Sequence, residues 1–177
     1  VAAFYIVVLQ AVLAFTVPAV RAAGLSALVA STAYLAINVT AMVARLIWGK
    51  VADRQDGNRR ARTLVEVGLV AAAGALVFTF ALHAGPVAVI AAAVVFGFGA
   101  LGWNGIVYVS AGELAAPELA GRSVAVAATV VFLISALCTP LLGAVASAAG
   151  WDAFWVSIGL LALAGALIAV RLPTPVS

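Results

Sequence analysis

Residues 87–112 read VAVIAAAVVFGFGALGWNGIVYVSAG and contain no charged side chain. A helix needs roughly 20 apolar residues to cross about 30 Å of hydrocarbon, so this run is long enough to span a bilayer. Similar apolar runs occur at residues 1–20, 27–49, 63–83, 123–147 and 153–170. The sequence therefore predicts an all-α membrane protein in which six transmembrane helices form a single bundle over residues 1–177.

The composition supports a membrane location. Of the residues, 67% are hydrophobic and 8% are charged, whereas about a quarter of the residues in soluble domains are charged. Membrane strands alternate polar and apolar residues over about ten positions, and the runs here are apolar on every side. Helices are therefore expected rather than strands.

Basic residues lie mainly in alternate connections between the runs. One side of the predicted bundle carries Lys50, Arg54, Arg59, Arg60, Arg62, Arg122 and Arg171. The connections on the other side carry only Arg21. Because cytoplasmic loops are enriched in Lys and Arg, we expect both ends of this segment in the cytoplasm, and the chain in the plasma membrane, which in bacteria is the inner membrane. Trp151 and Trp155 flank an outer turn, where indole rings are expected at the lipid interface.

Patterns typical of soluble enzymes have simpler interpretations in this chain. Residues 97–102 fit G-x-G-x-x-G, but a dinucleotide site needs a soluble strand, turn and helix, so no cofactor is expected. The glycines of this run instead predict close helix packing or a bend: Gly97, Gly99, Gly102 and Gly105. His83 has no Cys, Asp or His at ligand spacing, so no metal site is expected.

The polar stretch between the second and third runs is the most specific signal. It reads GKVADRQDGNRR at residues 49–60 and resembles the cytoplasmic loop signature of the major facilitator superfamily, roughly Gly-x-Leu-Ala-Asp-Arg-x-Gly-Arg-Arg. Val51 replaces the usual Leu, and Asp56 and Asn58 alter the step from Gly to the paired Arg. A positive-inside loop would explain the arginines. It would not explain Gly49 and Asp53 four residues apart at a helix end.

The resemblance implies that this loop acts as a gate that braces one conformation of a transporter. Gly49 would permit close approach of a neighbouring helix, and Asp53 would meet the N-terminal N–H groups of that helix and a nearby Arg. The candidate gating residues are Arg45, Gly49, Asp53, Arg54, Gly57, Arg59 and Arg60.

Other stretches resemble the same family and indicate which part of it the chain is. GWNG at 102–105 and ELAAPELAGR at 113–122 are similar to the tenth helix and the loop after it, and VPAV and GLS within 17–26 to the end of the seventh helix. The resemblance implies the C-terminal half of a twelve-helix bundle, a fragment lacking the N-terminal half. Pro140 and Gly143 resemble a helix kink of this family, and proline can bend a spanning helix.

Polar side chains within the apolar runs are the candidate substrate-binding residues, since such groups are costly in hydrocarbon and tend to face a cavity. Asn104 and Tyr108 share one helix face, and Trp103 lies beside them. The resemblance places the first and fourth runs along the transport cavity, which adds Gln10, and Asn38 is the next candidate. Interhelical hydrogen bonding stays an alternative for each residue. None of these residues is a carboxylate, so we expect a neutral solute, or an anion neutralised by the other half.

The sequence thus predicts a permease, a secondary transporter that moves a small solute by alternating access. Its partners would be the lipid bilayer, the missing N-terminal six-helix half and the small-molecule substrate. Nucleic acid is not expected, because the basic residues lie in membrane connections. The alternatives are a non-transporting receptor or scaffold on the same fold, and a membrane enzyme subunit. An enzyme would need clustered catalytic polar residues at one membrane face, and the sequence shows none.

Overall fold

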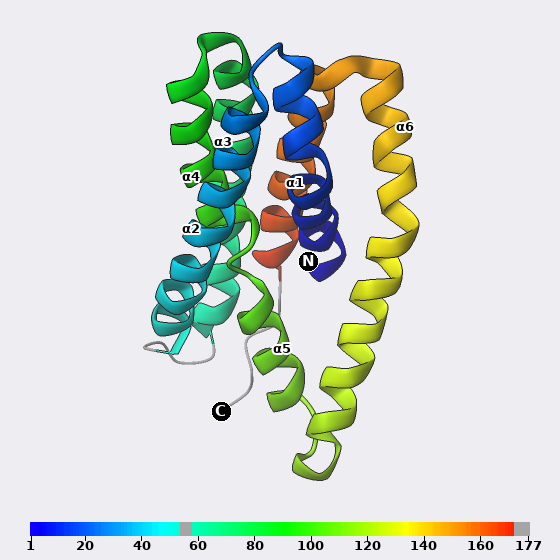
Figure 1. Cartoon of the computed structure of the whole chain (residues 1–177). Coiled ribbons are helices and arrows are strands. Elements are labelled where there is room, and N and C mark those ends of the chain that lie inside the picture. Colours follow the sequence, from blue (N-terminus) through cyan, green and yellow to red (C-terminus); the bar gives the residue numbers. More distant parts are fainter. Residues whose placement is uncertain (54–57, 172–177) are drawn as a thin grey trace.

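The computed structural model describes residues 1–53 and 58–171. These residues form helices and contain no strand, which confirms the all-helical prediction. The elements in chain order are α1 (Ala2–Ala22), α2 (Ala27–Asp53), α3 (Asn58–Ala84), α4 (Pro86–Ala100), α5 (Asn104–Glu113), the 3₁₀ turn η1 (Pro117–Leu119) and α6 (Ala120–Ala169). Figure 1 shows the helices aligned roughly along one common axis.

Five stretches among the described residues are long and apolar enough to cross a membrane: Ala2–Ala22, Ala27–Asp53, Arg60–Ala84, Pro86–Glu113 and Pro117–Ala169. Their length and composition support a multi-pass membrane protein. The last stretch has 53 residues, more than twice the roughly 20 that one crossing needs. Within it, Gly150 has a non-helical backbone with φ 80° and ψ 170°, and the two parts of α6 run in opposite directions (Figure 1).

The first part of α6 remains helical through Pro140. Gly150 is the residue within α6 whose φ and ψ are non-helical, and the Thr139 hydroxyl donates to the Ser135 carbonyl at 2.8 Å, one helical turn away. A kink at Pro140 and Gly143 therefore stays a prediction.

Three turns at one end of the bundle contain a glycine with positive φ: Gly24, Gly85 and Gly150. The backbone region that Gly150 occupies is essentially restricted to glycine, so the reversal of α6 depends on this residue. We call this end the glycine-turn end. The opposite end, where α2 ends, α3 begins and η1 lies (Figure 1), is called the basic end after Lys50, Arg60, Arg62 and Arg122.

The fourth apolar run does not form the uninterrupted helix expected over 87–112. α4 ends at Ala100, α5 begins at Asn104, and residues 101–103 between them are not helical. Glycine lowers helix stability by about 1 kcal/mol relative to alanine, and Gly102 lies against α2, where an added Cβ would be 3.0 Å from the indole nitrogen of Trp48. We call residues 101–103 the helix break.

Close approach of α4 to its neighbours depends on Gly97 and Gly99. A Cβ at Gly97 would lie 2.6 Å from the carbonyl oxygen of Ile37 in α2, and one at Gly99 would lie 2.7 Å from the Cα of Ala71 in α3. These contacts, like that of Gly102, confirm the expected glycine packing. At Gly105 no described atom would lie within 4 Å of a Cβ, so the described part of the structure shows no close packing there, and the alternative of a bend stays a prediction.

An aromatic cluster fills the bundle near the glycine-turn end. Trp155 is 0% exposed, and its ring centroid lies 5.1 Å from that of Phe78, 5.6 Å from Phe96 and 4.9 Å from Phe154. The interfacial position expected for Trp155 is therefore wrong, because the reversal at Gly150 directs this side chain into the bundle. Trp151 remains half-buried.

Candidate substrate site and gate

The helix break leaves backbone carbonyls without their usual helical donors, and two side chains of α2 meet them. The indole nitrogen of Trp48 donates to the Phe98 carbonyl at 2.9 Å. Nε of Arg45 donates to the Leu101 carbonyl at 3.4 Å. Arg45 was assigned to the loop motif from the sequence, and the structure places its guanidinium group at the break. The end of α4 and the first residue of the break thus accept hydrogen bonds from one neighbouring helix.

Two polar atoms at the break are buried and lack a hydrogen-bond partner among the described residues. Trp103 is 1% exposed, and neither its Nε1 nor the Oδ1 of Asn104 has a partner. The Trp103 ring packs against Tyr5 of α1 with ring centroids 6.0 Å apart. Tyr5 in turn donates its hydroxyl to the Leu64 carbonyl of α3 at 2.6 Å. Adjacent residues therefore present one free donor and one free acceptor inside the bundle.

The other three predicted substrate residues do not form a defined group with Trp103 and Asn104 at the break. Gln10 on α1 and Tyr108 on α5 are half-buried. Asn38 is also half-buried, and its amide nitrogen donates to the Tyr34 carbonyl at 2.8 Å within α2. No hydrogen bond in the described ranges 1–53 and 58–171 joins these three residues to the break. The structure therefore brings Trp103 and Asn104 together and leaves the rest of the set as a prediction.

At the basic end, an ion pair joins the start of α3 to the end of α5. The guanidinium group of Arg60 contacts the carboxylate of Glu113, with 21% and 56% of the two side chains exposed. The Ser123 hydroxyl donates to the Ala111 carbonyl at 2.7 Å and ties α6 to the same end of α5. Arg60 was expected to supply charge near Asp53, and the partner that the structure gives it is Glu113.

The other candidate gating residues present an open surface. Asp53 is exposed, and no described residue forms an ion pair with it. No described atom lies within 4 Å of a Cβ placed at Gly49, so none of the described residues packs closely against it. Arg54, Gly57 and the side chain of Arg59 lie outside the described part of the structure.

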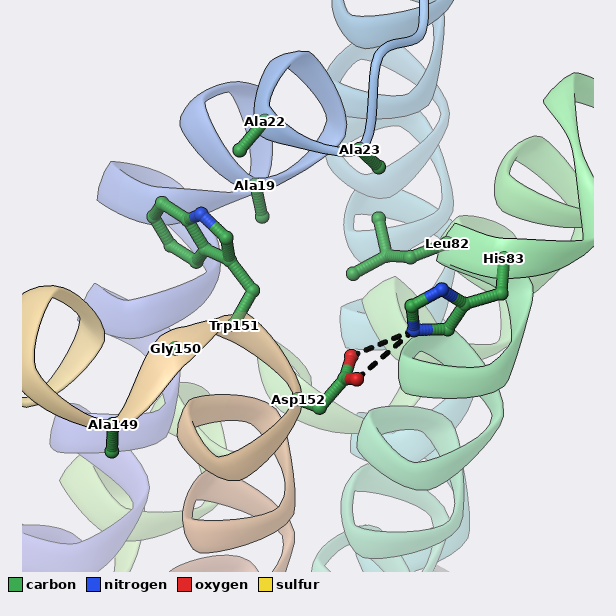
Figure 2. A pocket seen from close by; sticks show the side chains of 9 residues that line it. All are labelled: Ala19, Ala22, Ala23, Leu82, His83, Ala149, Gly150, Trp151 and Asp152. Atoms are coloured by element: carbon green, nitrogen blue, oxygen red, sulfur yellow. Dashed lines mark hydrogen bonds and ion pairs between the residues drawn. The ribbon is translucent and has the colours of Figure 1, made fainter.

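A separate pocket of about 270 Å³ lies at the glycine-turn end, between the ends of α1 and α3 and the turn at Gly150. Figure 2 shows His83 and Asp152 facing each other at its edge. The His83 Nε2 lies 2.9 Å and 3.1 Å from the two carboxylate oxygens of Asp152. None of the predicted substrate or gating residues lines this pocket.

Sequence reasoning did not identify these partnerships. Trp48 and Phe98 are 50 residues apart, Arg45 and Leu101 are 56 apart, and His83 and Asp152 are 69 apart. No local spacing rule connects such residues. The one available signal was the uncharged run with several glycines, which permitted a bend but did not identify which helix would support it.

Comparison with known families identifies the family of the chain. The family model of the Major Facilitator Superfamily matches residues 1–138, which include α1 to α5, the polar loop, the helix break and the beginning of α6. A comparison with curated proteins finds no match. Because the family model covers well over half of the sequence, the chain belongs to the major facilitator superfamily.

Proposed function

We propose that this chain is the C-terminal six-helix half of a secondary transporter that moves a small solute by alternating access. The two parts of α6 then count as two crossings, which gives six in all. The proposal rests chiefly on the helix break, where Trp103 Nε1 and Asn104 Oδ1 are buried without a hydrogen-bond partner in the described part of the structure. Interrupted helices form binding sites in several transporter folds, because unwound backbone is tolerated where it lines a cavity.

The free donor and acceptor at the break suggest the chemistry of the solute. A buried polar group without a partner costs roughly 1–3 kcal/mol, and a solute that offers both an acceptor and a donor would remove this cost for both atoms. No carboxylate lies beside Trp103 or Asn104 in the fourth run. These features favour a neutral polar solute, such as one that carries amide or hydroxyl groups.

The apolar surface of the bundle supports two further partners, the lipid bilayer and an N-terminal six-helix half. The first part of α6 exposes large hydrophobic side chains along its length: Val126, Val130, Phe132, Leu133, Leu137 and Leu141. α2 is similar, with Leu35, Val39, Met42 and Leu46 exposed. Water would not solvate such faces favourably. Lipid chains would cover some of them, and a second bundle would cover those next to the site.

The position of Asp53 supports a gate at the loop motif. Asp53 is the last residue of α2, and a negative charge at a helix C-terminus is unfavourable because it faces the negative end of the helix dipole. The carboxylate has no ion-pair partner among the described residues. A helix N-terminus or an arginine of the other half would offset this cost in one conformation and not in the other.

The positive-inside rule supports an orientation with the basic end in the cytoplasm, in a bacterium at the inner membrane. Single cysteines at Lys50 and Ala23, both exposed, test this in a Cys138→Ser background of the full-length protein. An impermeant maleimide should label Ala23→Cys in intact cells and Lys50→Cys only after permeabilisation. Labelling of Lys50→Cys in intact cells would reverse the orientation.

The substrate site makes a second prediction. A thermal-stability screen of the purified full-length protein against neutral polar small molecules should find a stabilising solute, and proteoliposomes should transport it. Trp103→Phe removes the unpartnered indole donor and Asn104→Ala removes the amide with the unpartnered oxygen, so the KM of transport should rise about fivefold or more, as expected for roughly 1 kcal/mol per lost hydrogen bond. Tyr108→Phe and Gln10→Ala test the rest of the predicted set in the same assay.

Ser110→Ala is the matched control for these variants. Ser110 lies on the same short helix, and its hydroxyl already donates to the Ile106 carbonyl at 2.8 Å, so its removal should leave KM unchanged. A full-length protein that binds no neutral solute would contradict the proposed substrate class. Transport with an unchanged KM in all four site variants would contradict the proposed site.

A further inference from the structure

We propose that Arg45 and Trp48 act together as positioning residues, which we call the clasp, that hold the helix break in the geometry needed at Trp103 and Asn104. Neither side chain need touch the solute. The clasp acts on the backbone carbonyls of Phe98 and Leu101, and through the backbone on the positions of Trp103 and Asn104. Its effect on transport rests on the proposed function, whereas its effect on the break does not.

The two clasp residues act from one face of α2. Residues three apart in a helix lie on the same side, so Arg45 and Trp48 reach the break together. Their donors contact carbonyls three residues apart, at Phe98 and Leu101. In a continuous helix these carbonyls would accept from the N–H groups of residues 102 and 105. The clasp therefore supplies from outside the donors that the interruption removes.

Each clasp residue adds a second interaction that suits this position. The guanidinium charge of Arg45 lies beside the C-terminal end of α4, where the helix dipole favours a cation. The Trp48 ring packs against Phe98 with centroids 5.3 Å apart, and it also lies against the bare Cα of Gly102. A larger residue at 102 would separate the indole nitrogen from its carbonyl partner.

The helix beyond the break buries fewer residues than the helix before it, and its far end is tied to α3 and α6 by the Arg60–Glu113 ion pair and the Ser123–Ala111 hydrogen bond. Ile106 is the buried residue of α5, whereas α4 has seven buried residues: Val89, Ala92, Ala93, Phe96, Gly97, Gly99 and Ala100. The break itself is held between α2 and α1, since Trp103 packs against Tyr5 on the side of α1. The far end of α5 is thus fixed by α3 and α6, whereas at the break the clasp holds the end of α4 from α2.

Hydrogen–deuterium exchange of the full-length protein in nanodiscs tests the clasp without any solute. Trp48→Phe keeps an aromatic ring and removes the indole donor, and Arg45→Gln removes the charge. Trp48→Phe should speed exchange across residues 98–113 about tenfold, as local opening becomes easier when a carbonyl loses its donor. The effect of Arg45→Gln should be smaller, about threefold, because the bond from this exposed side chain is 3.4 Å long and hydrogen bonds weaken beyond about 3.2 Å. Arg45→Lys, which keeps the charge, should recover part of the protection.

Arg21→Gln is the matched control, because it removes a comparable bond from an arginine to the Leu25 carbonyl, 2.9 Å long, at the glycine-turn end. It should leave exchange across 98–113 unchanged. Exchange in Trp48→Phe and Arg45→Gln equal to that of the unmodified protein would overturn the clasp.

Solute affinity then separates the clasp from the proposed site. With the solute found by the stability screen, Trp48→Phe should weaken binding together with the change in exchange, and Asn104→Ala should weaken binding without it. Faster exchange with unchanged affinity in Trp48→Phe would overturn the positioning role, provided that Asn104→Ala still weakens binding. Unchanged affinity in Asn104→Ala, beside faster exchange in Trp48→Phe, would overturn the proposed site and leave the clasp as a determinant of the break.

Discussion

Gly99→Ala should lower the stability of the full-length protein far more than Gly105→Ala. Both residues lie in the same glycine-containing run, but a Cβ at Gly99 would lie 2.7 Å from the Cα of Ala71, whereas a Cβ at Gly105 would meet no atom of the described residues within 4 Å. The neighbour at Gly99 is backbone, which cannot rotate away. α3 and α4 would have to separate, at a cost of about 1–3 kcal/mol for overpacking.

The measurement is the midpoint temperature of unfolding in detergent, followed by the fraction of monodisperse protein after heating. Gly105→Ala should be neutral or slightly stabilising, since alanine favours a helix over glycine by up to about 1 kcal/mol. Equal midpoints for the two variants would show that the close contact between α3 and α4 is absent from the folded protein in the membrane.

Asp53→Asn should reduce transport about tenfold while the amount of folded protein in the membrane stays the same. The substitution keeps the shape of the side chain and removes its charge, so it would abolish the proposed pairing with the other half. Coupling energies in conformational switches are typically about 1–3 kcal/mol, and 1.4 kcal/mol corresponds to a factor of ten. Folding should not suffer, because Asp53 is exposed and lies at the C-terminal end of α2, where the helix dipole disfavours a negative charge.

Glu118→Gln provides the control for Asp53→Asn. Glu118 is an exposed carboxylate in η1 at the same end of the bundle, so the variant changes the net charge equally without altering the loop motif. Transport in Asp53→Asn at the unmodified rate would reduce the motif to a positive-inside loop. A loss of equal size in both variants would assign the effect to surface charge rather than to a gate.

Most of the fold could be predicted because each spanning helix must be long and apolar enough to cross the hydrocarbon layer of the membrane. The first run, expected at 1–20, is α1 at Ala2–Ala22, and the second, expected at 27–49, is α2 at Ala27–Asp53. Interruptions within a run follow no such requirement. Residues 101–103 depend on contacts of Gly102 with a helix about 50 residues earlier in the chain, so composition alone did not reveal the break.

The candidate site was predictable only in part, for a related reason. Trp103 and Asn104 could be singled out because polar groups within an uncharged run need an explanation. The contacts of Arg45 and Trp48 with the break could not be predicted, since they depend on how α2 packs against α4. Likewise, a tryptophan next to a turn was expected at the interface, and only the direction of the chain after Gly150 shows that Trp155 is buried.

The two ends of the bundle differ in how freely their connections can change in length. At Gly24, Gly85 and Gly150 the chain turns within a few residues, and each turn uses a positive φ. An inserted residue there would displace the helices on either side, among them the parts of α3 and α6 that His83 and Asp152 join. At the basic end, no such backbone constraint is present at the connection from α5 to α6. Tags, cleavage sites and reporter domains can therefore be inserted around Glu118, at the basic end of the bundle.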